Sequence, residues 1–216
     1  MDKIIAAIIK FFTELLKTKT PVPAPVAPEP VKKVWSRQLF KEYMNLAIGA
    51  YAHVRETEGH NRSKEIDAFN KLADVDIGSP YCVSGAVFGL YPYIIKLAKA
   101  DGIHLQYAGP ETASSQSFFK RGAKAVIGGP VFGAAAIYQQ LANPTRGHFT
   151  TCLVDKLNGK KFETFEFNTS VEVEKNGEME RDGQGASFKT RSIDGYASMR
   201  FLGFVDVYQF FVVDNG

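Results

Sequence analysis

Apolar residues follow two different periods along this chain. Within residues 35–54 they recur at helical spacing, and a second helix is predicted over residues 63–72, with Ser63 as its N-cap. Small and apolar residues follow Gly78-Ser79-Pro80, which predicts a buried helix that begins at Pro80 or just after it. The first part of the domain is therefore expected to be helical.

The later part of the chain has the composition of β-strands. Val, Phe, Thr and Tyr are concentrated there, as is typical of residues on a pleated, half-buried surface. Strands are predicted over residues 149–157, 162–167, 171–174, 186–191 and 201–213, with hairpin turns at Asn158-Gly159 and Asn176-Gly177. Helices followed by antiparallel strands predict an α+β domain over residues 35–216, with N-terminal helices packed on an antiparallel β-sheet.

The first 34 residues carry a third pattern. On a helical wheel, the large apolar side chains of residues 1–18 occupy one half and the polar side chains the other, which predicts an amphipathic helix. Residues 19–34 form a Pro-rich linker with five prolines within residues 20–30, a composition that favours an extended spacer. The tethered helix is expected to lie on a membrane surface, bind a protein partner, self-associate or fold back on its own domain.

Composition narrows the classes of function. The chain has 216 residues, of which 45% are hydrophobic and 23% charged, as in one globular domain of ordinary size. Lys and Arg number 26 against 23 Asp and Glu, and this small net charge of +3 argues against nucleic-acid binding. The two cysteines cannot form a disulfide framework, and no Cys or His spacing is typical of a zinc site. No metal or organic cofactor is expected.

Cys82 is the first candidate for chemistry, because it lies where the third helix is predicted to start. A thiolate there is stabilised by the helix dipole, and the Cys82 N–H would point at an oxyanion formed in front of it. His148 follows Gly147 at the predicted entry of a strand, where its ring can project from the sheet edge toward the helix. The imidazole is then placed to act as the base for the thiol.

Glu166 and Asn168 are the candidates for a third member of the site. They lie two positions apart on the next predicted strand, so their side chains are expected on the same face, and either could fix the second nitrogen of the His148 ring. The other one is expected to polarise or position a substrate amide. Cys152 lies within a strand and far from any helix terminus, and it is interpreted as a core residue.

In combination, these residues resemble the CHAP (cysteine, histidine-dependent amidohydrolase/peptidase) domains and their NlpC-type relatives. The similarity runs in order through about residues 45–207, in blocks at residues 54–62, 78–82, 147–148, 164–169, 181–185 and 201–205. The resemblance implies a papain-like fold and a thiol enzyme that hydrolyses amide bonds in the peptide part of bacterial peptidoglycan. It also implies a set of catalytic residues, namely Cys82, His148, Glu166 and Asn168, and no cofactor.

The biological setting that the resemblance favours is a phage lysin. Such a protein is found in the host cytoplasm or on the virion and acts at the bacterial cell wall, with residues 1–18 as a potential peripheral membrane contact. Two alternatives use the same fold. One is a non-catalytic virion or wall-binding protein, and the other is a thiol acyltransferase on small amides.

Three segments depart from the family pattern. Residues 133–138 lack the usual Gly-Asp ahead of the strand that precedes the histidine. Residues 90–130 form a long insert, interpreted either as a surface excursion or as a wall of the substrate groove. Asp74-x-Asp76-x-Gly78 is similar to the calcium loop of some members, but a third carboxylate is missing there, so calcium is not expected.

Overall fold

A computed structural model describes residues 33–170, 173–175, 178–180 and 184–214, and the chain from Lys33 onward forms one compact unit. Four sequence predictions fall wholly or partly on residues outside the described ones. They are the amphipathic helix of residues 1–18, the linker of residues 19–34 except for its last two residues, the first half of the strand predicted over residues 171–174, and the Asn176-Gly177 turn.

Two helices open the compact unit. They are α2 (Arg37–Tyr51) and α3 (Lys64–Leu72), and each begins after a serine whose hydroxyl accepts a hydrogen bond from a backbone N–H of the first turn. At α3 this bond runs from the Ile66 N–H to the Ser63 hydroxyl over 3.3 Å. The two predicted helices and the predicted N-cap Ser63 are confirmed.

A third helical segment begins at Cys82, as expected for a helix that starts just after Pro80. It runs without a break through α4 (Cys82–Gly85), the π-helical turn η1 (Ala86–Leu90) and α5 (Tyr91–Ala100). Pro92 in the first turn of α5 explains the widened turn before it. Proline has no N–H to donate to the carbonyl four residues earlier, and its ring clashes with that carbonyl, so the α-helical pattern is interrupted there.

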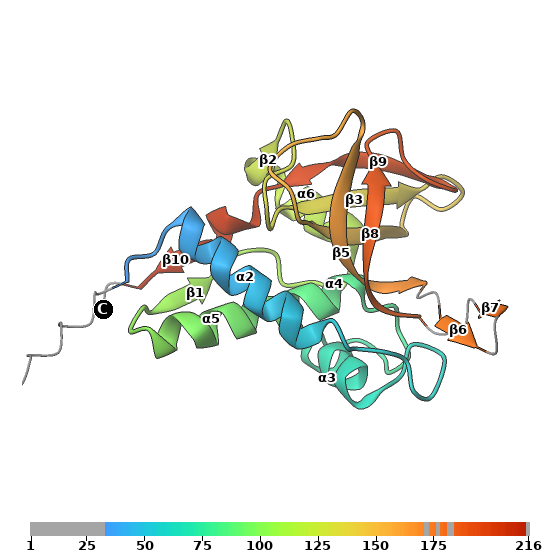
Figure 1. The fold of residues 1–216 in the computed structure, drawn as a ribbon, viewed down its shortest axis with the longest axis horizontal. Coiled ribbons are helices and arrows are strands. Elements are labelled where there is room, and N and C mark those ends of the chain that lie inside the picture. Colours follow the sequence, from blue (N-terminus) through green and yellow to red (C-terminus); the bar gives the residue numbers. More distant parts are fainter. Residues whose placement is uncertain (1–32, 171–172, 176–177, 181–183, 215–216) are drawn as a thin grey trace, which may run out of the picture. The chain divides into compact units, whose positions relative to one another are not determined.

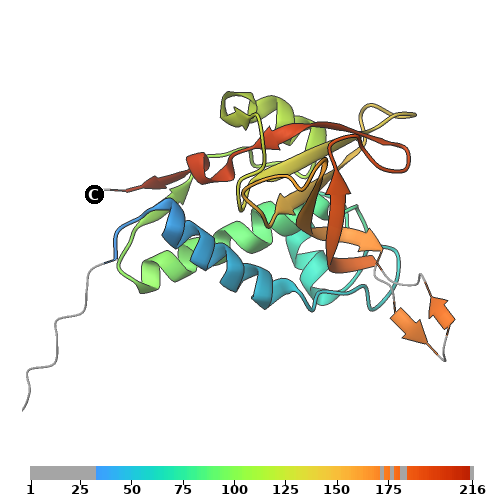
Figure 2. The same ribbon diagram turned by 45° about the horizontal axis from the view of Figure 1, so that its top comes forward.

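Six of the described strands form one antiparallel sheet with the order β2-β9-β3-β4-β5-β8. Its strands are β2 (Val126–Ile127), β9 (Met199–Val205), β3 (Ala135–Gln140), β4 (Gly147–Cys152), β5 (Lys161–Ser170) and β8 (Gln184–Ser192). Two small antiparallel ribbons accompany it, β1 (Leu105–Tyr107) with β10 (Phe211–Val213) and β6 (Val173–Lys175) with β7 (Glu178–Glu180). The α+β prediction is confirmed, with the helical layer lying beside the sheet (Figure 1 and Figure 2).

Several predicted strand boundaries were wrong. The strand predicted over residues 149–157 begins at Gly147 and ends at Cys152, after which the chain leaves the sheet. The stretch predicted as one strand over residues 201–213 is interrupted by the 3-10 turn η3 (Val207–Phe210), which separates β9 from β10. At residues 158–161, however, the predicted tight turn is present, with Gly159 at φ +62°.

β3 was not predicted as a strand, and its burial explains why. Ala135 and Ile137 pack into the core shared with the helices, whereas Ala136 and Tyr138 pack into a second cluster on the opposite face. All four side chains are fully buried. A strand buried on both faces lacks the apolar–polar alternation by which strands are identified.

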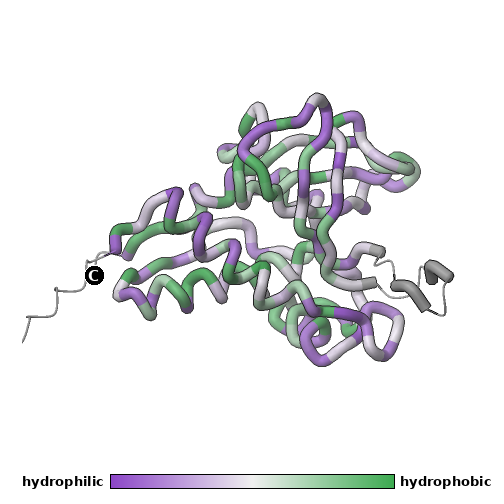
Figure 3. Tube along the Cα trace, viewed as in Figure 1, coloured by the Kyte–Doolittle hydropathy of each residue, from purple (hydrophilic) through white to green (hydrophobic). Residues whose placement is uncertain are grey.

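The insert of residues 90–130 belongs to the core. It contains all of α5, the strand β1 and the helix α6 (Ser115–Arg121), and it buries Ile94 and Phe118 completely. Its interpretation as a surface excursion is therefore wrong. In Figure 3, hydrophobic segments recur along α2 and α5, as expected for helices that pack against each other with one face each.

α4 joins the helical layer to the sheet, because it packs on both β4 and β5. Gly85 of α4 permits this close approach: a Cβ atom at this position would lie 2.6 Å from the ring of Phe167 on β5. The start of the helix is thus held against β4 and β5, the two neighbouring strands that carry the other candidate residues.

Candidate active site

Cys82 is the first residue of α4 and is buried, with an exposed fraction of 6%. The turn before it is fixed from α3 by the fully buried side chain of Asn70. Its Nδ2 donates to the Ser79 carbonyl over 2.9 Å, and its Oδ1 accepts from the Ser84 hydroxyl over 2.9 Å. One amide therefore anchors the chain on both sides of the cysteine.

No side chain caps the N-terminus of α4. The first N–H groups of a helix have no partner within the helix, and they carry the positive end of its dipole. Cys82 is the first residue of this helix, so it lies at this end of the dipole. This is the arrangement expected for a site that stabilises negative charge on sulfur and on an adjacent oxygen.

His148 is the second residue of β4, as the sequence predicted. Gly147 before it has no space for a side chain, because a Cβ atom would lie 2.1 Å from the Tyr138 carbonyl oxygen. The imidazole is hydrogen-bonded to the Cys82 thiol, and its Nε2 lies 3.0 Å from Oε2 of Glu166. Because Nε2 faces the carboxylate, Nδ1 is the nitrogen left to face the thiol.

Glu166 lies on β5, with a side chain that is completely inaccessible to solvent. Besides His148, its carboxylate accepts a hydrogen bond from the Thr164 hydroxyl at 2.6 Å and one from Nε of Arg191 at 2.6 Å. Nη2 of Arg191 donates to the second carboxylate oxygen. Both oxygens are thus fully satisfied, and the carboxylate has a single orientation toward the imidazole.

Arg191 is the residue that sequence reasoning missed. It lies on β8, where the register pairs it with Phe162 of β5. Side chains of directly paired residues share a face, and Phe162 and Glu166 are four positions apart on one strand, so the Arg191 side chain lies on the face that carries Glu166. Its guanidinium lies 3.9 Å from the ring centroid of Tyr196 and also donates to the Thr169 hydroxyl over 3.3 Å. The strand prediction for residues 186–191 included this arginine, but its face could be assigned only once the pairing of β5 with β8 was known.

These contacts set the charges of the site. Burial disfavours the imidazolium form of His148, but its hydrogen bonds with Cys82 and Glu166 outweigh burial and raise its pKa from 6.5 to about 9. Burial also disfavours the Glu166 carboxylate, but His148 and Arg191 lower its pKa to about 2. The raised pKa of the imidazole favours its taking up a proton, and the Glu166 carboxylate beside it is ionised at neutral pH.

Asn168 is not placed as predicted. The register of β5 against β8 shifts between Glu166 and Thr169, and Asn168 has a left-handed φ of +52°. A β-bulge inserts an extra residue and resets the alternation of side chains, so the expectation that Asn168 shares a face with Glu166 was wrong. Its Oδ1 is buried without a hydrogen-bond partner in the described part of the chain. Of the two orienting candidates, the structure brings Glu166 to His148.

Cys152 is fully buried in the second cluster, beside residues such as Ala134 and Phe162. Burial raises the pKa of its thiol. A protonated thiol enclosed by apolar side chains is a poor nucleophile, which agrees with the predicted packing role.

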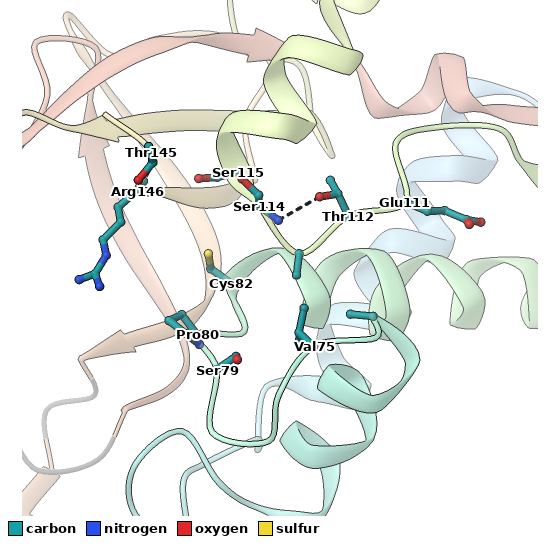
Figure 4. A pocket seen from close by; sticks show the side chains of 13 residues that line it. Val75, Ser79, Pro80, Cys82, Glu111, Thr112, Ser114, Ser115, Thr145 and Arg146 are labelled. Atoms are coloured by element: carbon teal, nitrogen blue, oxygen red, sulfur yellow. Dashed lines mark hydrogen bonds between the residues drawn. The ribbon is translucent and has the colours of Figure 1, made fainter. Parts of the chain in front are cut away.

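A cavity of about 670 Å³ opens in front of Cys82 (Figure 4). Three segments form its walls: the turn before α4, the segment that leads into α6, and the end of the β3–β4 connection. The residues that line it are Ala73, Val75, Ser79, Pro80, Cys82, Glu111, Thr112, Ala113, Ser114, Ser115, Thr145, Arg146 and Gly147. Part of the 90–130 insert therefore forms a wall of the groove, as its second interpretation predicted.

The loop that was compared with a calcium site forms a turn, with positive φ values at Asp74 and Gly78 and a hydrogen bond from the Ser79 N–H to the Asp76 carbonyl over 3.0 Å. Across the described residues, His, Cys, Asp and Glu side chains do not gather in a group of three or more that could hold a metal ion. Within the same residues, none of the helices has both the length and the apolar character needed to cross a membrane.

Comparison of the chain with protein-family models gave no match, and comparison with curated proteins gave no significant similarity.

Proposed function

We propose that this protein is a cysteine hydrolase with a papain-like, CHAP/NlpC-type domain that cleaves amide bonds in the peptide part of bacterial peptidoglycan. The observation that carries the proposal is the hydrogen-bonded row of Cys82, His148 and Glu166 beside an open cavity. The nucleophile is at a helix start, the base is on a strand and the acid is on the next strand, which is the order of a thiol triad.

The chemistry follows from the positions of the three groups. His148 takes the proton of the Cys82 thiol, and the sulfur attacks the carbonyl carbon of the scissile amide. The N–H groups at the start of α4 bind the oxyanion. His148 then gives its proton to the departing amine as the carbon–nitrogen bond breaks, which leaves an acyl-enzyme thioester. Water, deprotonated by His148, attacks the thioester and releases a carboxylate, and the thiol is restored.

Glu166 and Arg191 act through His148. Glu166 fixes the orientation of the ring and keeps Nδ1 toward sulfur, while Arg191 holds Glu166 in its ionised form. A fully hydrogen-bonded network of this kind supports a catalytic role over that of a non-catalytic virion or wall-binding module. The choice of peptidoglycan as substrate, and of a phage lysin acting at the bacterial cell wall, comes from the sequence resemblance.

The test is digestion of purified peptidoglycan by the full chain, with mass spectrometry of the soluble fragments. Wild-type protein should release muropeptides that carry a new amino and a new carboxyl end, and Cys82→Ala should release none. Cys152→Ala is the matched control, because it removes the other thiol from a cluster outside the cavity. Equal release by wild type and Cys82→Ala would refute the proposal. The fragment masses also identify which amide bond is cut.

A further inference from the structure

The connection between β8 and β9 carries Tyr196, whose ring lies against the guanidinium of Arg191. The central carbon of the guanidinium is 3.9 Å from the ring centroid, so the ring covers one face of the cation. The same cation donates to both oxygens of Glu166, through Nε and Nη2. Arg191 is therefore held between an aromatic face and a carboxylate, and Tyr196 extends the row of side chains that begins at Cys82.

Two unusual backbone conformations flank Tyr196. Gly195 before it has φ +89°, and Ala197 after it has φ +47°, in the left-handed region that residues with a Cβ atom rarely adopt. A Cβ atom at Gly195 would lie 2.2 Å from the Met199 carbonyl oxygen. The Tyr196 N–H donates to that carbonyl over 3.1 Å, and the Tyr196 carbonyl accepts from the Met199 N–H over 2.8 Å. The connection thus gives Tyr196 a defined backbone position beside Arg191.

Tyr138 of β3 contacts the ring of Tyr196 from another side. The two rings meet at an angle of 71° with their centroids 4.9 Å apart, which is an edge-to-face contact. The Tyr138 hydroxyl donates to the Ser192 carbonyl at the end of β8 over 3.1 Å. Burial raises the pKa of both tyrosine hydroxyls, so both are neutral at neutral pH. The titratable groups that act on the Arg191 charge are therefore the Glu166 carboxylate and two neutral phenols.

An aromatic face attracts a cation most strongly where water is excluded, and the side chain of Arg191 is only 14% exposed. We propose that Tyr196 is a positioning residue of the active site, whose ring keeps Arg191 paired with Glu166. Through that carboxylate it keeps the His148 ring aligned with the Cys82 thiol. The inference rests on the proposed function, because it adds a residue to the same site. A loosened guanidinium would let the carboxylate turn away from the imidazole, which would then take up the thiol proton less readily.

The rate at which iodoacetamide alkylates Cys82 tests the inference without depending on cleavage, because alkylation needs the thiolate that forms when His148 takes the proton. In the full chain, Tyr196→Leu should slow alkylation at neutral pH by roughly 3- to 10-fold and move the midpoint of its pH dependence to higher pH. Tyr196→Phe keeps the ring and should restore the rate to within about 2-fold of wild type. In an Arg191→Met background, Tyr196→Leu should have no further effect, because the ring acts through the guanidinium.

Tyr208 offers a matched control, because Arg37 lies 4.5 Å from its ring centroid and donates to both oxygens of Asp206. The same three kinds of group meet there, and none of them lines the cavity. Tyr208→Leu should therefore lower the stability to urea and leave the alkylation rate of Cys82 unchanged. Tyr196→Met, which keeps more of the side-chain length, replaces Tyr196→Leu if urea denaturation shows that the latter is unfolded.

A wild-type alkylation rate in the folded Tyr196→Leu or Tyr196→Met protein would overturn the inference. An equally slow rate in Tyr196→Phe, or an undiminished effect in the Arg191→Met background, would also overturn it. Failure of the proposed function would look different: Tyr196 would still control the alkylation of Cys82, while the wild-type chain would leave purified peptidoglycan uncut.

Discussion

Glu166→Gln tests whether the buried carboxylate is held by both His148 and Arg191. The substitution keeps the shape of the side chain and removes its charge, which leaves the Arg191 guanidinium, only 14% exposed, without a counter-charge. The pKa of Glu166 is lowered from 4.5 to about 2 by its partners. At about 1.4 kcal/mol per pKa unit, this corresponds to roughly 3 kcal/mol, similar to the roughly 3–5 kcal/mol lost when one partner of a buried pair is removed.

Urea denaturation at pH 7 measures this loss as a lower free energy of unfolding. Arg191→Met added to Glu166→Gln should recover part of the stability, because it removes the unpaired cation, whereas activity on peptidoglycan should stay low because His148 is still unanchored. Glu163→Gln is the matched control on the same strand. Glu163 is exposed and contacts Thr190, so the free energy of unfolding should change by no more than ~0.5 kcal/mol.

The pKa shifts of Glu166 and His148 fix how the stability of the folded protein depends on pH. The pKa of Glu166 is lowered, so its stabilisation is present above about pH 4.5 and is lost as the pH falls toward 2. The pKa of His148 is raised, so its stabilisation is present below about pH 6.5 and is lost as the pH rises through about 9. A loss of less than about 1 kcal/mol in the free energy of unfolding of Glu166→Gln at pH 7 would contradict a carboxylate held by both partners. So would a double variant in which Arg191→Met adds its full loss of stability to that of Glu166→Gln.

Three further predictions follow from the site and the chain organisation. Iodoacetamide at neutral pH should alkylate Cys82 and spare Cys152, as read by peptide mapping, and preferential labelling of Cys152 would reverse the assignment of the nucleophile. Glu166→Ala should lower turnover by roughly 100-fold or more through a misplaced base. Asn168→Ala should lower turnover far less, and an equal loss of turnover in the two variants would place Asn168 among the catalytic residues. Deletion of residues 1–32 should preserve hydrolysis of isolated peptidoglycan and reduce lysis of intact cells, and an unfolded truncation product would show that these residues belong to the core.

Local signals in the sequence were enough to identify the nucleophile and the base. Pro80 is a local signal for a helix start, and it placed Cys82 at a helix N-terminus without any knowledge of tertiary structure. His148 was placed by the glycine before it and the β-rich segment after it. Local signals of this kind depend only on neighbouring residues, so the sequence was sufficient.

The remaining parts of the site depend on pairing between strands. A bulge in β5 turns Asn168 away from the face of Glu166. Asparagine tolerates the left-handed backbone of this bulge, but a single asparagine within a strand-like segment does not predict one. Arg191 meets Glu166 only because of the register of β8 against β5, which is set by the whole sheet. β3 was missed because Ala136 and its neighbours are buried on both faces.

Cys82, His148, Glu166 and Arg191 form a row of four neighbouring groups, contributed by α4, β4, β5 and β8, in which the charges can balance. Once Cys82 has given its proton to His148, charges of alternating sign follow one another through Glu166 to Arg191, and they sum to zero. The field of such an arrangement decays much faster with distance than that of a single ion. Ionic strength and distant surface charges should then act weakly on proton transfer inside the row and more strongly on the exposed charged residues that line the cavity, Glu111 and Arg146, so salt should change KM much more than kcat.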